Sequence, residues 1–232
     1  AISVAEHFSP ETIDFLWGLR FNNEKPWFEA HRAEYEAYLQ EPIRTLGRRV
    51  FDALDEALPG ENLRLHIARI YRDARRLYGR GPFKENLWFS IEQPSTEQAP
   101  MPGFYFSIGP EHYGYGMGFF DARAAAMQVY RQEIDRAPAQ ALALAERFAA
   151  QDTFVLEGPV YARPKGHPGG LLDDWYNRRS LSLNFESAPD AGLFDPALAE
   201  RILEGYRFLT PYYQWLQGIA SRAAADGLDD RT

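Results

Sequence analysis

The stretch LRLHIARIYRDARRLYGRGPFKENLWFSIE, residues 63–92, decides the fold. Apolar and polar residues alternate over 63–67 and again over 87–91. A period of two is typical of a half-buried β-strand, since successive side chains of a strand point to opposite faces. The two predicted strands enclose a basic segment with a Gly-Pro turn, and we expect them to pair across it.

Similar patterns outward from this stretch predict the other elements. Further strands are predicted at 104–108, 113–119, 153–157 and 181–185, and an irregular segment at 158–180. Apolar residues at helical spacing predict helices at 10–21, 26–39, 43–58, 121–136 and 138–151, and two C-terminal helices that begin at Pro196 and Pro211. Pro42 is expected to break or kink the run between the second and third helices, because an interior proline removes a backbone hydrogen bond.

Strands in the middle of the chain with helices at both ends predict an α+β fold with a mainly antiparallel sheet. The helices at both chain ends are expected to pack on this sheet. We find no internal repeat and expect a single domain over residues 1–225, with a frayed C-terminal tail at 226–232.

The strand predicted at 113–119 has glycine at every second position: Gly114, Gly116 and Gly118. A bare strand face lets a side chain or a neighbouring backbone approach closely. A phosphate-binding turn is the alternative, but the G-x-G-x-x-G spacing and its βαβ context are missing. The pattern therefore favours close packing.

Composition excludes several classes of protein. The chain has 232 residues, a net charge of -8 and 45% hydrophobic residues, which suits a packed core. A sequence pI near 5.2 makes general nucleic-acid binding and membrane-surface binding unexpected. The absence of cysteine rules out disulfides, thiolate zinc sites and cysteine nucleophiles.

Targeting and metal-binding signals are also missing from the sequence. No apolar run approaches the roughly 20 residues that cross a bilayer, and the first residues lack the features of a signal peptide, so we expect a cytoplasmic protein without membrane contact. The five histidines are scattered, without the H-x-x-x-H spacing that places two ligands on one helix face, and we expect no metal site.

The basic loop is the first candidate site. Arg69, Arg72 and Arg75 recur every three residues, and Lys84 follows a Gly-Pro turn that could return it over them. Guanidinium and ammonium groups that converge on one point suit phosphate or carboxylate, because charge-assisted hydrogen bonds are short and strong. The alternative is a structural network in which acidic residues such as Asp73 pair with these bases.

The segment RPKGHPGG is the second candidate. Arg163 and Lys165 lie among prolines and glycines, a composition that favours a fixed turn with exposed side chains. These cations could supply the second half of the same anion site, or belong to an ordinary surface turn.

Several of these motifs together resemble a family of bacterial and fungal proteins catalogued as domain of unknown function 2461. The resembling segments are FLWGLRFNNEKPWFEAHRAEYE, ARIYRDARRLYGRGPFKEN, PGFYFSIGPEH, YRQEI and RPKG, which follow one another in the expected order. The family has an aromatic residue where this chain has Arg76, and an acidic-basic pair where it has Gly79-Arg80. The resemblance implies a shared fold and brings no activity, cofactor or catalytic residue with it.

Two functional hypotheses follow, and they belong to different classes. In the first, Arg69, Arg72, Arg75, Lys84, Arg163 and Lys165 bind a small anionic ligand that carries phosphate or carboxylate, with hydrolase or transferase chemistry as an extension. In the second, the protein is a noncatalytic interaction module whose basic patch docks an acidic partner. The sequence assigns no catalytic residue, no cofactor and no oligomeric state.

Overall fold

The computed structural model describes residue 2 and residues 6–229. The chain forms two compact units. Unit 1 consists of the residues up to Ile91, Tyr105–Tyr115 and Glu186–Glu204, and unit 2 consists of Glu92–Phe104, Gly116–Phe185 and the residues from Gly205 on. The single-domain boundary at residue 225 stays a prediction, and residues 230–232 of the predicted tail lie outside the described residues.

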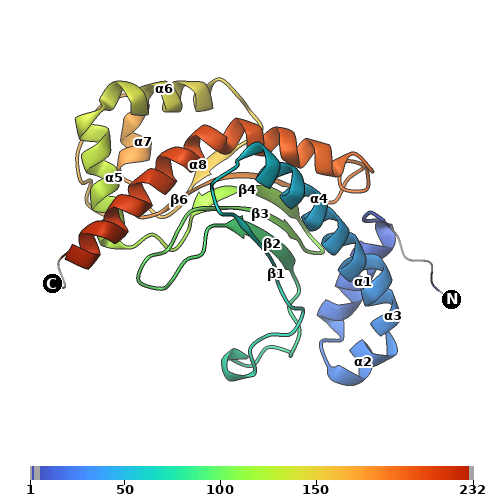
Figure 1. Cartoon of the computed structure of the whole chain (residues 1–232). Coiled ribbons are helices and arrows are strands. Elements are labelled where there is room, and N and C mark those ends of the chain that lie inside the picture. Colours follow the sequence, from blue (N-terminus) through green and yellow to red (C-terminus); the bar gives the residue numbers. More distant parts are fainter. Residues whose placement is uncertain (1, 3–5, 230–232) are drawn as a thin grey trace. The chain divides into compact units, whose positions relative to one another are not determined.

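All six predicted strands are confirmed, with ends that differ from the prediction by at most two residues (Figure 1). They form a six-stranded antiparallel sheet in the order β1-β2-β3-β4-β6-β5. The α+β class is therefore confirmed. The strands are β1 Arg64–Ile67, β2 Leu87–Glu92, β3 Gly103–Ile108, β4 Tyr113–Phe119, β5 Val155–Glu157 and β6 Leu181–Ser187.

The glycines of β4 allow a neighbouring strand to approach closely. A Cβ atom on Gly116 would lie 2.1 Å from the carbonyl oxygen of Leu183 in β6. A Cβ atom on Gly118 would lie 2.7 Å from the ring of Phe120 and 2.8 Å from Cβ of Ser182. Any larger residue would push this strand pair apart, so the packing interpretation of the alternating glycines is confirmed.

The helices of unit 1 are α1 Pro10–Phe21, α2 Lys25–Ala30, α3 Arg32–Tyr35, the π-helical turn η1 Glu36–Gln40, and α4 Glu41–Ala57. The prediction of one continuous helix over 26–39 is wrong, because the chain leaves helical geometry at His31. The imidazole Nδ1 of His31 lies 2.7 Å from the carbonyl oxygen of Trp27, and the two rings stack at 3.9 Å.

The predicted break at Pro42 takes the form of the π-turn η1. Pro42 lies in the first turn of α4 and has no N–H for the carbonyl of Tyr38, four residues earlier. The hydroxyl of Thr12 in α1 donates a hydrogen bond of 2.5 Å to that carbonyl instead. Thr12 is fully buried and also accepts a hydrogen bond from the backbone N–H of Ser9. Thus α1 supplies the donor that the proline removes.

Unit 2 contains α5 Ala124–Arg136, α6 Pro138–Ala149 and α7 Leu172–Tyr176. Helix α5 begins at Ala124, three residues after the predicted start at residue 121. Helix α7 lies inside the segment predicted to be irregular, where Trp175 and Tyr176 are buried. The hydroxyl of Tyr130 in α5 donates to the backbone oxygen of Trp175 at 2.8 Å, which links these helices.

The C-terminal segment is one helix, α8 Leu198–Asp229, and not the two predicted helices. Pro211 lies inside it and leaves the turn before it short of a backbone donor. Two side chains donate to carbonyls of that turn: the hydroxyl of Thr210 to Tyr206 at 2.7 Å, and the guanidinium of Arg147 to Phe208 at 2.7 Å. These bonds stabilise the helix through the proline.

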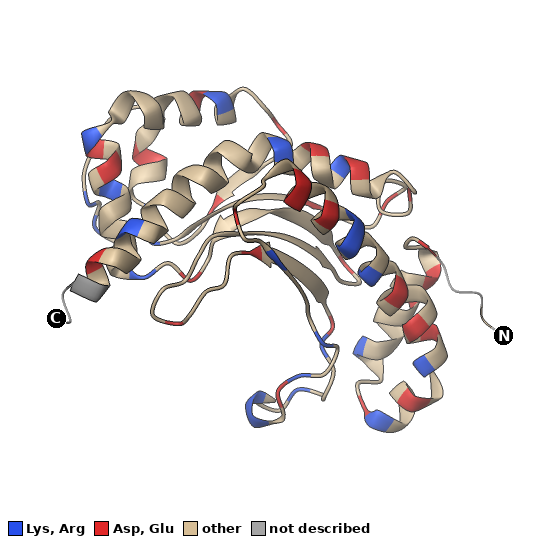
Figure 2. Cartoon of the chain, in the orientation of Figure 1, with Lys and Arg blue, Asp and Glu red and all other residues tan. Residues whose placement is uncertain are grey.

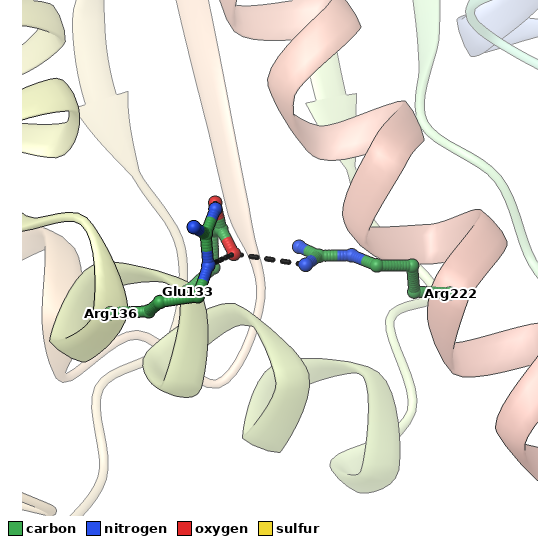
Figure 3. A network of polar contacts seen from close by, with 3 residues as sticks. All are labelled: Glu133, Arg136 and Arg222. Carbon is green, nitrogen blue, oxygen red and sulfur yellow. Dashed lines mark hydrogen bonds and ion pairs between the residues drawn. The ribbon is translucent and has the colours of Figure 1, made fainter.

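A buried carboxylate joins α5 to α8 within unit 2 (Figure 3). Glu133 is only 7% exposed. It accepts hydrogen bonds from Arg136 at 2.5 and 3.0 Å and from Arg222 at 2.9 Å. Both guanidiniums hold the pKa of Glu133 below its ordinary value, chiefly through the hydrogen bonds from Arg136.

Candidate functional site

The basic segment forms a two-stranded arm that continues β1 and β2 beyond the sheet (Figure 1). We call residues 68–86 the basic arm. Its strands are joined by backbone hydrogen bonds from Arg72 to Pro82 at 2.8 Å and from Lys84 to Ile70 at 2.7 Å. The predicted pairing of the two strands across this segment is therefore confirmed.

Phe83 anchors the basic arm in unit 1. Its ring is fully buried and stacks on Phe28 at 4.2 Å. The side-chain amide of Asn23 accepts a hydrogen bond from the backbone N–H of Phe83 at 3.0 Å and donates one to its carbonyl at 2.9 Å. Gly81 passes so close to Asn23 that a Cβ atom would lie 2.3 Å from the amide oxygen. The base of the arm is thus tightly held.

The tip of the arm is a tight turn around the short 3-10 helix η2, Ala74–Arg76. Tyr78 and Gly79 both have positive φ angles, of 51° and 81°, and Tyr78 is 82% exposed. A left-handed conformation is uncommon for a bulky residue. The guanidinium of Arg80 donates to the carbonyls of Leu77 and Arg76, both at 3.1 Å, and so closes the turn.

Most cations of the arm have no carboxylate partner. Arg72 donates to the carbonyl of Gly81 at 2.9 Å, and the Lys84 ammonium to that of Arg69 at 2.6 Å. Among the described residues, no ion pair neutralises Arg69, Arg72, Arg76, Arg80 or Lys84. Backbone carbonyls position Arg72, Arg80 and Lys84 but do not neutralise their charge.

The two acidic residues of the arm pair with other arginines. Asp73 accepts bonds from Arg75 at 3.1 and 3.0 Å, and these bonds lower the pKa of Asp73. Glu85 lies 3.4 Å from Arg20 of α1. The ion-pair alternative therefore describes Arg75 well, whereas the other cations of the arm stay uncompensated. Figure 2 shows basic residues gathered along the arm.

Several of these cations line one open hollow, which we call the arm groove. Its volume is about 520 Å³. The Lys84 ammonium lies 4.8 Å from the centre of the Trp88 ring, a cation–π distance, at this hollow. The lining residues are Arg72, Asp73, Arg76, Arg80, Lys84, Glu85, Asn86 and Trp88.

The pKa values of two groups in the groove reflect partial burial and crowding of positive charge. Burial lowers the pKa of Lys84, and Arg69 lowers it further. Burial likewise lowers the pKa of Arg72, with Arg80 acting in the same direction and Glu85 against it. An anion in the groove would relieve this repulsion.

The structure brings together only part of the predicted site. Arg72 and Lys84 share the arm groove, whereas Arg69 lines a different cavity of about 280 Å³. Arg75 pairs with Asp73, and its side chain is 87% exposed. The predicted site omitted Arg76 and Arg80, which also line the arm groove. The hairpin and its turn bring them there, and no spacing in the sequence signals that placement.

Arg163 and Lys165 belong to unit 2, and both are exposed. The backbone N–H of Lys165 donates to the side-chain oxygen of Asn177 at 2.7 Å, and the Asn177 amide donates to Gly166 at 3.1 Å. Asn177 therefore fixes this turn. The Lys165 ammonium lies 4.9 Å from the ring centre of Tyr161.

Two other features, a metal-binding cluster and a membrane-spanning helix, are absent from the described residues. No three His, Asp or Glu side chains among them are grouped so as to hold a metal ion. None of the described helices has the length and apolar character needed to cross a membrane.

The fold and the basic arm define the chain as an α+β protein with an exposed cationic centre. A family profile described as conserved hypothetical protein, DUF2461, matches residues 11–215. The chain therefore belongs to this family, as the resemblance of its motifs predicted. A search of the curated proteins found no match.

Proposed function

We propose that the protein binds a small, multiply charged anion, such as a phosphate-bearing metabolite, in the arm groove. One observation carries the proposal: Arg72, Arg76, Arg80 and Lys84 line one hollow and no carboxylate pairs with them in the described part of the chain. Guanidinium forks and an ammonium group in one hollow suit the oxygens of phosphate.

The chain as a whole carries a net charge of -8, so it repels anions at long range. Four cations against two carboxylates in the groove reverse this charge locally. Arg75 and Arg20 pair with those two carboxylates, so the four cations that line the groove keep a net positive charge that can bind a ligand. A multiply charged anion gains most from such a site.

Adjacent arginines provide the test. Arg76→Ala removes a groove cation, and we expect the dissociation constant for pyrophosphate to rise about tenfold, as the loss of one charge-assisted hydrogen bond predicts. Arg75→Ala removes an exposed guanidinium that is already paired with Asp73, and we expect less than about a twofold change. Isothermal titration calorimetry at two salt concentrations measures both.

The result can overturn the proposal in two ways. If wild-type protein gives no saturable binding of pyrophosphate or inorganic phosphate, the groove is not a small-anion site. If Arg75→Ala weakens binding as much as Arg76→Ala, the response reflects the general charge of the arm and not the groove.

A second function is favoured by the tip of the arm. Tyr78 is 82% exposed and is held there in a left-handed conformation, next to unpaired cations. Exposed tyrosine and arginine are enriched where proteins bind other proteins. The arm would then dock an acidic partner without catalysis, and Tyr78→Ala would weaken that complex while leaving pyrophosphate binding unchanged.

A further inference from the structure

A second cavity of unit 1 is chemically unlike the arm groove. It lies between the beginning of the basic arm and the segment from α3 to α4, and its volume is about 280 Å³. This volume is close to the lower end of small-molecule sites, about 300 Å³. We call it the arginine-rimmed cavity, after Arg32, Arg44 and Arg69.

The cavity combines apolar lining with polar groups. Ile67 and Tyr71 line it and keep accessible surface, with 43% of Tyr71 exposed, whereas the neighbouring Ile43, Ile70 and Leu87 are at most 2% exposed. The arginine side chains reach solvent, with 40% of Arg32 and 55% of Arg44 exposed. An apolar interior with a few convergent polar groups is the usual composition of a small-molecule site.

The net positive charge of the three rim arginines determines which ligand charge the cavity favours. Arg32 makes a bidentate pair with Glu29, at 2.7 and 3.1 Å, and is neutralised. Arg44 lies 3.4 Å from Glu41, a long contact. No side chain of the described residues pairs with Arg69. The uncompensated charge is close to one, which suits a monoanion better than a phosphate dianion.

Tyrosine hydroxyls add directed polar contacts. Tyr71 accepts a hydrogen bond from Arg32 at 3.2 Å. Tyr35 is 6% exposed and lines the same cavity. Burial raises the pKa of Tyr35, against the opposing effects of Arg44 and a hydrogen bond with the side chain of Gln40, so its hydroxyl stays protonated and neutral.

The π-turn η1 shapes this wall of the cavity. Gln40 is its last residue, and Tyr35 directly precedes its first. A π-turn carries an extra residue and is found mostly where a functional site repays its poorer geometry. Here Thr12 donates a partly buried hydrogen bond to its residue Tyr38.

We infer that the arginine-rimmed cavity binds a small carboxylic acid with a compact aromatic or branched hydrocarbon body. The hydrocarbon contacts Ile67 and the ring of Tyr71, and the carboxylate meets Arg69 and Arg44 at the rim. This site is separate from the arm groove and does not depend on the function proposed for it.

A set of matched probes tests the inference by protein NMR titration. Benzoate carries both the ring and the carboxylate, acetate only the carboxylate, benzyl alcohol only the ring, and phenyl phosphate a second charge. We expect benzoate to bind at least about tenfold more tightly than each of the others, because burying a ring and pairing a carboxylate each contribute more than about 1.4 kcal/mol.

The variants Arg69→Gln and Arg44→Gln should each weaken benzoate binding, Arg69→Gln by about tenfold. Both residues are exposed, so the variants should fold. Arg48→Gln is the control, since Arg48 is an exposed arginine of the same helix, four residues after Arg44, and does not line this cavity. We expect less than about a twofold change.

Four outcomes would overturn the inference. Benzoate could give no saturable response; acetate could bind as well as benzoate; or Arg48→Gln could weaken binding as much as Arg69→Gln. Tighter binding of phenyl phosphate than of benzoate would also contradict it, because the rim would then prefer a dianion.

Discussion

The side-chain amide of Asn23 binds the basic arm as a neighbouring strand would. One donor and one acceptor meet the N–H and the carbonyl of Phe83. Gly81 has no side chain, so the backbone of the arm can approach the amide closely; a Cβ atom here would clash with Asn23. The role of Asn23 is therefore to fix the arm to unit 1.

We predict that Asn23→Ala lowers the free energy of unfolding by about 1–3 kcal/mol, because it leaves the N–H and carbonyl of Phe83 without their partner. Hydrogen exchange at the Phe83 amide should become faster. Urea denaturation and exchange measured by NMR check both effects.

Asn22→Ala is the matched control for this variant. Asn22 donates from its side chain to Gly18 at 2.9 Å, but that contact is exposed. We expect a loss below about 1 kcal/mol and unchanged exchange at Phe83. Equal effects of the two variants would contradict the role of Asn23 as the anchor.

At the scale of elements, helices α1 and α4 depend on each other through one hydroxyl. Pro42 removes the donor for the carbonyl of Tyr38, and Thr12 replaces it. We predict that Thr12→Val, which keeps the shape and removes the hydroxyl, costs about 1–3 kcal/mol of unfolding free energy, since a partly buried carbonyl loses its donor. Thermal and urea unfolding measure the change.

Thr12→Ser keeps the hydroxyl and loses only a methyl group, so it should cost about 1 kcal/mol. A cost of Thr12→Ser as large as that of Thr12→Val would mean that the methyl group and not the hydrogen bond stabilises this contact. If the π-turn shapes the arginine-rimmed cavity as proposed, Thr12→Val should also weaken benzoate binding.

The sequence predicted strands better than helix ends, for a physical reason. Alternation over 63–67 and 87–91 indicates that one face of the strand is buried, and this signal lies within the strand's own residues. By contrast, α8 continues through Pro211, and Thr210 and Arg147 donate to the nearby carbonyls of Tyr206 and Phe208. Arg147 is distant in sequence, so no local pattern could reveal that contact.

The candidate site could be predicted only in part for the same reason. A count of basic residues located the arm and both Arg72 and Lys84. Arg20 of α1 pairs with Glu85, a tertiary contact, whereas the pairing of Arg75 with Asp73 is local, two residues apart. Spacing alone does not distinguish an arginine that meets a carboxylate from one that does not. Sequence spacing therefore ranked Arg75 above Arg76, whereas the structure pairs Arg75 with Asp73.

At the scale of the whole molecule, a buried carboxylate should make the free energy of unfolding depend on pH. Glu133 is a buried carboxylate with two arginine partners, Arg136 and Arg222 (Figure 3). Their hydrogen bonds lower its pKa from the ordinary 4.5. A carboxyl group whose pKa is lower in the folded state stabilises that state fully above the unfolded value, and this contribution is lost as the pH falls through the folded value.

We therefore predict that Glu133→Gln lowers the free energy of unfolding by about 1–3 kcal/mol at neutral pH. The difference between wild type and variant should stay constant down to the ordinary pKa of 4.5 and then shrink with further acidification, because wild-type Glu133 becomes protonated and neutral like the variant. Urea denaturation over a pH series measures the difference.

Glu146→Gln, at an exposed position of α6, is the control, and its effect should stay within about 0.5 kcal/mol. A difference for Glu133→Gln that is as large in acid as at neutral pH would show that shape, and not charge, makes this residue stabilising.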